Sequence, residues 1–224
     1  ESLLKTLMNV IAIPDYISFC SHCFLLTFFT AACPQIFNLI EKDVLSFTKT
    51  EIIFIGNLLI VGALVGFVLG GLMVDRLGTK YVFMFCHLGF GTILILFLLR
   101  SIFPGEIIVI VGILTLLFGL VQAASGLAMT SETLVLIPKE NKSLATGLWF
   151  TLYSGGAGLS GFLSSKVLEL KLINPEWSML GLQMSSYDGL LLMFGTMVLL
   201  MTVTLGLIPS VIKKAPAAWI PQST

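Results

Sequence analysis

The sequence predicts an all-α, polytopic membrane protein with six transmembrane helices. Its 224 residues are 57% hydrophobic and only 11% charged, whereas about one quarter of a typical soluble domain is charged. The mean hydropathy is +1.03. Six apolar runs of about 20 residues, the length that crosses a hydrocarbon core of about 30 Å, are separated by polar segments. Helices are the expected structure because an open sheet would leave unpaired backbone groups in lipid.

The N-terminal half of the chain contains three of these runs. Residues 1–10 precede them, and the segment 2–9 has the pattern of a short amphipathic helix at a membrane interface. The predicted spans are residues 11–36, 52–74 and 81–102. The turn between the second and third spans, residues 75–80, is very short, whereas the segment 38–51 on the opposite side is longer.

The C-terminal half contains three further spans. They are residues 107–128, 144–167 and 190–211, of which 144–167 is the least hydrophobic. The segment 170–188 is a longer connection. We expect residues 11–212 to form one six-helix bundle, followed by a cytoplasmic tail, 213–224. The sequence begins with Glu1 rather than Met, so we expect it to be part of a longer chain.

The distribution of basic residues predicts the orientation. An even number of spans places both termini on one side, and that side carries seven basic residues: Lys5, Arg76, Lys80, Lys139, Lys142, Lys213 and Lys214. The other side carries five: Lys42, Lys49, Arg100, Lys166 and Lys171. Because loops rich in Lys and Arg face the cytoplasm, the termini are expected there.

Charge and reactive side chains exclude several classes of function. The formal net charge is zero, which gives no overall field for nucleic acid. The four cysteines, Cys20, Cys23, Cys33 and Cys86, lie in apolar runs, where a thiol behaves as a small hydrophobic group. Cys20, His22 and Cys23 lack a fourth metal ligand, so we expect no metal and no cofactor. We find no nucleophile with a base and no channel filter sequence, which argues against an enzyme or a channel.

The turn between the second and third spans carries the most informative motif. Residues 70–80 read GGLMVDRLGTK. This pattern resembles the loop motif of the major facilitator superfamily, in which Gly, three residues, Asp, a basic residue, any residue, Gly and further basic residues join two helices. The matching positions are Gly71, Asp75, Arg76, Gly78 and Lys80. Thr79 stands where the family usually has Arg.

The residue types in this motif have their own physical interpretation. Gly71 would let a neighbouring helix approach, and Gly78 would permit the tight turn. Asp75 can accept a hydrogen bond, and Arg76 can bridge to an acidic partner, for which we expect Glu132 at the end of the fourth span. The alternative is an ordinary short loop with the same letters.

Two further features resemble the family. Glu132, followed after six residues by Lys139, resembles the Glu and Arg element of sugar-porter members, although two unrelated charges at headgroup level are an equal alternative. Glycines recur every four residues in the second span, which predicts close helix contact; they are Gly62, Gly66 and Gly70. The fifth span is glycine-rich but lacks the proline of the antiporter motif. The uncharged fourth span favours the C-terminal half of such a transporter.

The resemblance implies that the first and fourth spans line a central cavity. Asp15, Ser18 and His22 share a face of the first span, and Gln122 and Ser125 share a face of the fourth, while Asn57 lies on the second. His22 is a candidate for proton coupling, but a histidine in a membrane is more often an interhelical hydrogen-bond partner. Asp15 follows Pro14 near the boundary, where solvation among headgroups is the favoured interpretation.

The function implied by the resemblance is secondary active transport of a small solute, by symport or uniport, through alternating access. The expected partners are the lipid bilayer, the solute and the other six-helix half, in the same longer chain or as a second copy. Few charges face the cavity, which favours a neutral, amphipathic or monoanionic solute. The alternative function is a non-transporting membrane scaffold or assembly subunit with the same fold.

Overall fold

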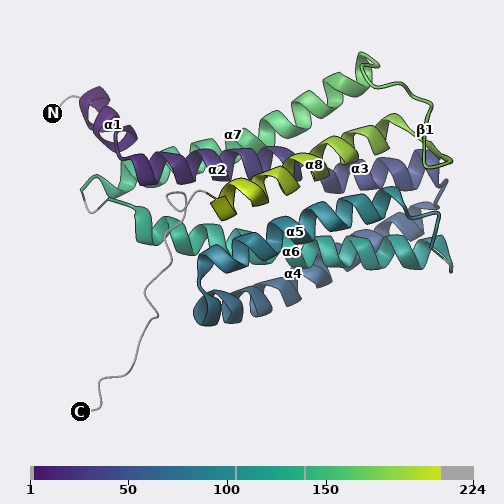
Figure 1. Ribbon diagram of the computed structural model, residues 1–224, viewed down its shortest axis with the longest axis horizontal. Helices are drawn as coiled ribbons and strands as arrows, with labels where there is room; N and C mark the ends of the chain where they lie inside the picture. The colour runs from purple at the N-terminus through teal and green to yellow at the C-terminus, as the bar shows by residue number, and fades with distance from the viewer. Residues whose placement is uncertain (1–2, 104, 139, 208–224) are drawn as a thin grey trace, which may run out of the picture.

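The computed structural model describes residues 3–103, 105–138 and 140–207, and these are almost entirely helical (Figure 1). The helices are α1 (Leu3–Ile11), α2 (Pro14–Thr30), α3 (Cys33–Leu39), the π-helix η1 (Ile40–Val44), α4 (Lys49–Leu77), α5 (Thr79–Leu98), α6 (Ile107–Leu136), α7 (Lys142–Glu169) and α8 (Ser186–Leu207). The long helices run side by side, and their connections alternate between two ends of the bundle.

Five helical segments are long and apolar enough to cross a membrane: Pro14–Val44, Lys49–Leu77, Thr79–Leu98, Ile107–Leu136 and Ser186–Val203. The protein is therefore an all-α, multi-pass membrane protein. The fifth predicted span corresponds to α7, which at 28 residues has the length to cross but is less apolar. The last residues of the sixth predicted span, 208–211, and the predicted tail lie outside the described residues.

The first span differs from the continuous helix predicted for residues 11–36. It starts at Pro14, because a proline at the first helical position has no amide to leave unsatisfied. It is interrupted at Ala31 and Ala32, since Pro34 lacks the N–H that would continue the ladder. The backbone N–H of Ala32 instead donates to Ser160 Oγ of α7 at 3.2 Å. The helical course then continues to Val44.

The ends of α4 follow local chemistry. Thr48 caps the N-terminus in a capping box, in which the Glu51 carboxylate accepts from the Thr48 N–H at 2.7 Å and Thr48 Oγ1 accepts from the Glu51 N–H at 3.4 Å. At the other end, Gly78 has a φ of +84°, a conformation open mainly to glycine, and α5 starts at the next residue.

The connection from α7 to α8 contains a small antiparallel hairpin of β1 (Trp177–Met179) and β2 (Leu182–Met184), where the sequence predicts only a long connection. Leu180 and Gly181 form its turn with φ values of +53° and +80°, the signs that suit a two-residue hairpin turn. Trp177 Nε1 donates to the Ser185 carbonyl at 2.9 Å, which ties the hairpin to the start of α8.

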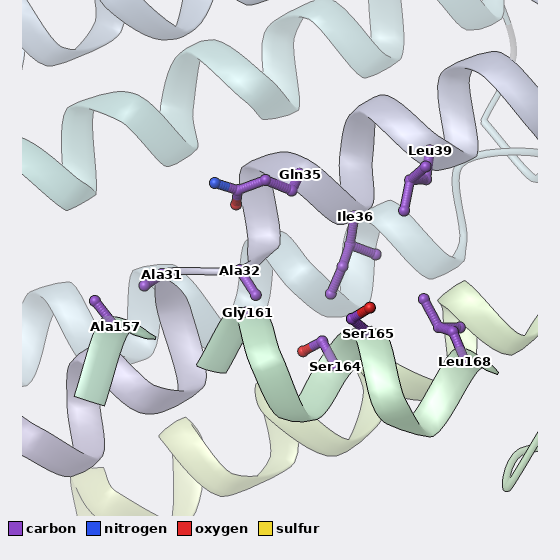
Figure 2. Close-up of a pocket in the computed structure, with 10 residues that line it drawn as sticks. All are labelled: Ala31, Ala32, Gln35, Ile36, Leu39, Ala157, Gly161, Ser164, Ser165 and Leu168. Carbon is purple, nitrogen blue, oxygen red and sulfur yellow. The ribbon is translucent and has the colours of Figure 1, made fainter. Parts of the chain in front are cut away.

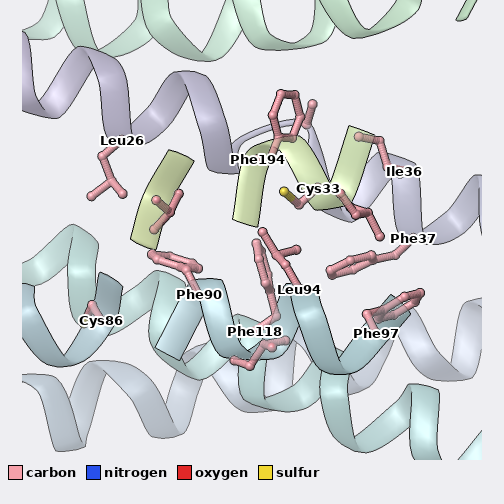
Figure 3. Packing of buried hydrophobic residues seen from close by; sticks show 14 of the residues in the cluster. Leu26, Cys33, Ile36, Phe37, Cys86, Phe90, Leu94, Phe97, Phe118 and Phe194 are labelled. Atoms are coloured by element: carbon pink, nitrogen blue, oxygen red, sulfur yellow. The ribbon is translucent and has the colours of Figure 1, made fainter. Parts of the chain in front are cut away.

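The helices pack in three main pairs: α2 with α7, α4 with α6, and α5 with α8, while α5 also lies along α6. A core of phenylalanines joins α3, α5, α6 and α8 (Figure 3). In it the Phe37 and Phe97 rings stack with centroids 4.3 Å apart, and Phe118 meets Phe37 edge-on at 5.1 Å. The outer face of α4 is apolar and exposed, as a lipid-facing surface should be; Leu64 and Val68 are 63% and 65% exposed.

Candidate functional site

The turn between α4 and α5 places a buried threonine against a buried glutamate. Thr79, the first residue of α5, donates its hydroxyl hydrogen to Glu132 Oε2 near the end of α6. Both side chains are buried, whereas Asp75 and Arg76 are exposed. Among the described residues no ion pair joins Arg76 to Glu132, so the expected charge cluster is replaced by a hydrogen bond from Thr79.

The other motif residues have simpler environments. A Cβ atom on Gly71 would meet Leu127 at 3.5 Å, an ordinary contact, so Gly71 does not mark a close helix approach. Its neighbour Gly70 does, because a Cβ there would lie 2.7 Å from the Ala124 Cα. Lys80 is half-buried. Lys139, the second member of the Glu and Lys element, lies outside the described residues.

The glycine stripe of the second span makes the close contact predicted for it. A Cβ atom on Gly62 would lie 1.9 Å from the Leu116 carbonyl oxygen, and one on Gly66 would lie 2.2 Å from that of Leu120. On the α6 side, a Cβ atom on Gly119 would lie 2.1 Å from the Leu59 carbonyl oxygen. Only glycine permits these backbones to touch.

The two histidines of the chain lie together inside the bundle. His22 of α2 and His87 of α5 have ring centroids 5.0 Å apart, and both side chains are buried. His87 Nδ1 is 2.6 Å from the Phe83 carbonyl oxygen, while the Nε2 atoms of both rings have no hydrogen-bond partner. His22 is thus paired with a second histidine rather than isolated. The sequence contains one other histidine, His87 in the predicted third span, and nothing in its spacing indicates that it meets His22.

The remaining predicted cavity residues do not form one polar cluster. Asp15, Ser18 and Gln122 are half-buried, Ser125 is buried without a hydrogen-bond partner, and Asn57 is exposed on the outer side of the bundle. No hydrogen bond joins Ser18, Asn57, Gln122 or Ser125 to another of these residues within the described chain. That the first and fourth spans line a central cavity stays a prediction.

A buried ion pair, for which the sequence carries no prediction, joins two helices at the end of the bundle opposite the α4–α5 turn. Arg100 Nη1 is 2.6 Å from Asp188 Oδ1, and both side chains are buried. Arg100 Nη1 also donates to the Phe97 carbonyl at 2.9 Å, and Asp188 Oδ2 accepts from the Ser185 N–H at 2.9 Å and from its hydroxyl at 2.7 Å. These bonds satisfy both charges and join the end of α5 to the start of α8.

The buried carboxyl group of Glu41 has no such partners. Glu41 in the π-helix is 0% exposed, and neither carboxyl oxygen has a hydrogen-bond partner. Its neighbour Asp43 accepts a hydrogen bond from the Tyr187 hydroxyl at 2.8 Å, which holds η1 beside α8. Single π-helical turns recur at functional sites, and an unpaired acid within a membrane segment is a functional candidate.

The α2–α7 pair is joined along one face of α7. Tyr16 donates to the Ala145 carbonyl at 2.6 Å, and Thr27 Oγ1 lies 3.2 Å from the Tyr153 carbonyl oxygen. Three residues beyond Tyr153, a Cβ atom on Gly156 would lie 2.4 Å from the Phe24 carbonyl oxygen. The inner face of α7 thus consists of small and polar residues, which explains its low hydropathy. Gly156, Ser160 and Ser164 recur every four residues, the same spacing that indicated the α4 contact.

A cavity of about 300 Å³ lies where α7 passes the interruption of the first span (Figure 2). It is lined by small, apolar and neutral polar residues: Ala31, Ala32, Gln35, Ile36, Leu39, Ala157, Gly161, Ser164, Ser165 and Leu168. Figure 2 shows Ile36 and Leu39 of α3 directed towards Ser165 and Leu168 of α7. The cavity therefore lies between the first and fifth spans.

The polar atoms of the cavity are hydrogen-bond acceptors or hydroxyls. Ser164 is 6% exposed, and its Oγ has no partner. The orientation of the Gln35 amide is assigned from its neighbours: with Nε2 placed towards the carbonyls of Ala31 and Ala32, it donates to them at 2.9 and 3.1 Å, and Oε1 is left as an acceptor. No charged side chain lines the cavity among the described residues.

Comparison with known proteins adds no relative. No family model, no curated protein and no solved structure matches the chain. Within the described residues, no group of three His, Cys, Asp or Glu side chains lies close enough to hold a metal ion. The interpretation of function therefore depends on the residues and their arrangement.

Proposed function

We propose that this chain is one six-helix half of a secondary transporter of the major facilitator type, which moves a small uncharged solute by alternating access. The observation that carries the proposal is the pairing of the helices. In span order, the first packs against the fifth (α2 with α7), the second against the fourth (α4 with α6), and the third against the sixth (α5 with α8).

This pairing has an internal symmetry. Exchanging spans one to three with spans four to six converts the first–fifth pair into the fourth–second pair and leaves the third–sixth pair unchanged. Two repeats of three helices, related by a two-fold axis, would produce this set of contacts. Nested repeats of three helices occur within each half of major facilitator transporters. In this proposal α7 is the fifth of six spans, with a hydropathy lowered by its serine and glycine face.

The glycine turn supports the same proposal. Gly78 closes a one-residue connection between α4 and α5, and the buried pair Thr79 and Glu132 fastens it to α6. Asp75 and Arg76 project from this end of the bundle and are exposed. They are free to meet a second bundle, whose approach and withdrawal would accompany alternating access.

The test is uptake by the full natural polypeptide in proteoliposomes. The vesicles are incubated with a mixture of uncharged solutes, and their contents are measured by mass spectrometry against protein-free vesicles. We expect enrichment of at least one solute, reduced several-fold by Asp75→Asn. Glu140→Gln, an exposed carboxyl in the connection between α6 and α7, is the matched control and should leave uptake unchanged. Contents equal to those of protein-free vesicles would favour the scaffold alternative.

A further inference from the structure

We propose that the cavity between α3 and α7 binds an uncharged small molecule that carries hydroxyl groups on one edge and an apolar surface on the other. This inference specifies the substrate class and the place of its site, and so it rests on the proposed function.

The first argument concerns charge. The lining residues contain neither an acid nor a base, so an ionic ligand would lose its hydration without gaining a counter-charge, a costly exchange. The nearby charged groups are on the α7 surface beyond the cavity, where Lys166 and Glu169 pair with each other at 2.6 Å. An uncharged ligand avoids this desolvation.

The second argument concerns hydrogen bonding. Ser164 Oγ is buried without a partner, and a buried hydroxyl without a hydrogen bond lowers stability. Together with Gln35 Oε1, this hydroxyl favours a ligand that forms hydrogen bonds as a donor and as an acceptor. A hydroxyl donates to a carbonyl and also accepts from a serine.

The third argument concerns shape. Ile36 and Leu39 of α3 supply apolar surface that faces the serines of α7, and Leu168 adds apolar surface beside them. The volume of about 300 Å³ is at the lower end of the range, about 300 to 1,000 Å³, that small-molecule sites occupy. The interrupted helix at Ala31 and Ala32 forms one end of the cavity, and broken helices at membrane depth occur where they are covered by protein or line a cavity.

The experiment measures protection of a cysteine in the cavity, in nanodiscs. Ala157→Cys places a thiol on the lining, and its rate of reaction with N-ethylmaleimide is followed with increasing 1,2-hexanediol. At about four times the Kd, four fifths of the sites are occupied and the rate should fall about fivefold. Ser154→Cys, exposed on α7 and outside the lining, is the control thiol. The four native cysteines are buried.

Two charged probes and three variants test the chemistry. Hexanoate and hexylammonium have the same alkyl length but carry a charge, and they should give little protection. Ser164→Ala should weaken protection by the diol about fivefold, the effect of one neutral hydrogen bond. Gly161→Leu should abolish it by filling the cavity, while Gly158→Leu should not; a Cβ atom at either glycine meets nothing within 4 Å.

The outcomes separate this inference from the proposed function. Equal protection by all three probes, or full protection in the Ser164→Ala protein, would overturn the inference. Solute uptake without diol protection would overturn it and leave the transporter proposal standing. Protection without uptake of any solute would support the binding site and contradict the transporter proposal.

Discussion

Thr79 donates a hydrogen bond to Glu132, and this contact between the first residue of α5 and the end of α6 supplies the partner of a buried carboxyl group. Thr79→Val should lower the free energy of unfolding by about 1–3 kcal/mol because the carboxyl is left unpartnered. Thr79→Val with Glu132→Leu should be nearly neutral, since both polar groups are then removed. Denaturant titration in detergent measures the coupling.

The controls for this double-mutant cycle distinguish Thr79 from Arg76 as the partner of Glu132. Arg76→Gln with Glu132→Leu should be additive within about 0.5 kcal/mol because Arg76 is exposed and no ion pair joins it to the buried Glu132 in the described structure. Thr130→Val, an exposed threonine on α6 that bonds only to the Gly126 carbonyl, should change little. Strong coupling of Arg76 to Glu132 would restore the charge cluster and contradict the contact described.

Breaking the ion pair at the opposite end should be more harmful. Asp188→Asn leaves the buried Arg100 without its counter-charge and should cost about 3–5 kcal/mol. The exposed pair Lys166 and Glu169 has the same 2.6 Å separation, yet Lys166→Met should cost at most about 1 kcal/mol because solvent screens it. Thermal unfolding of the two variants compares them, and equal losses would show that burial does not decide the outcome.

The α4–α6 contact should not accept a methyl group at its centre. Gly66→Ala forces a Cβ to within 2.2 Å of the Leu120 carbonyl oxygen, so the helices must separate, with a loss of about 1–3 kcal/mol or more. Gly56→Ala lies on the same helix with nothing within 4 Å of its Cβ. It should be neutral or stabilise by up to about 1 kcal/mol through helix propensity. Thermal unfolding measures the stability of both variants, and equal changes in stability would disprove the close approach of α4 and α6 at Gly66.

Glu41 and Glu51 should respond in opposite directions to the same substitution. Glu41→Met removes a buried carboxyl without partners and should stabilise the protein by about 1–3 kcal/mol. Glu51→Met removes half of a capping box and should destabilise it by about 0.5–2 kcal/mol. If Glu41 has a functional role, its stabilised variant will lose uptake. A destabilised Glu41→Met protein would reveal a partner for this carboxyl.

The orientation of the bundle is testable by labelling. Arg76→Cys lies at the α4–α5 turn, and Leu180→Cys lies at the tip of the hairpin, where the native side chain is 79% exposed. In intact cells a membrane-impermeant maleimide should label Leu180→Cys at once and Arg76→Cys only after permeabilisation, because the basic loops are expected in the cytoplasm. The reverse result would invert the topology and leave the fold unchanged.

The sequence predicted local features better than contacts between helices. The apolar runs and the glycine turn at Gly78 depend on neighbouring residues, so they could be located from composition and spacing. The interruption at Ala31 also had a local cause in Pro34, which the prediction of a continuous helix overlooked. The hairpin around Leu180 has no strong turn signal, because the left-handed positions are filled by Leu and Gly.

The candidate site was predicted less completely, for a physical reason. Which side chains meet depends on the rotation of each helix about its axis, and one sequence does not specify that rotation. Thus the partner of His22 is His87, and the partner of Glu132 is Thr79. The serines of α7 do carry a sequence signal, since Ser160 and Ser164 continue the four-residue spacing from Gly156.

The contact between α2 and α7 also joins parts of the chain that the ribosome makes at different times. Thr27 and Tyr153 are 126 residues apart, so at roughly 5–20 residues per second about 6 to 25 s separate their synthesis. Through that interval the α2 surface that packs against α7 exists without its partner helix. The weakly apolar α7, whose Gly156 lies against the Phe24 carbonyl, is synthesised only afterwards. The order of synthesis therefore makes α7 the later member of this helix pair.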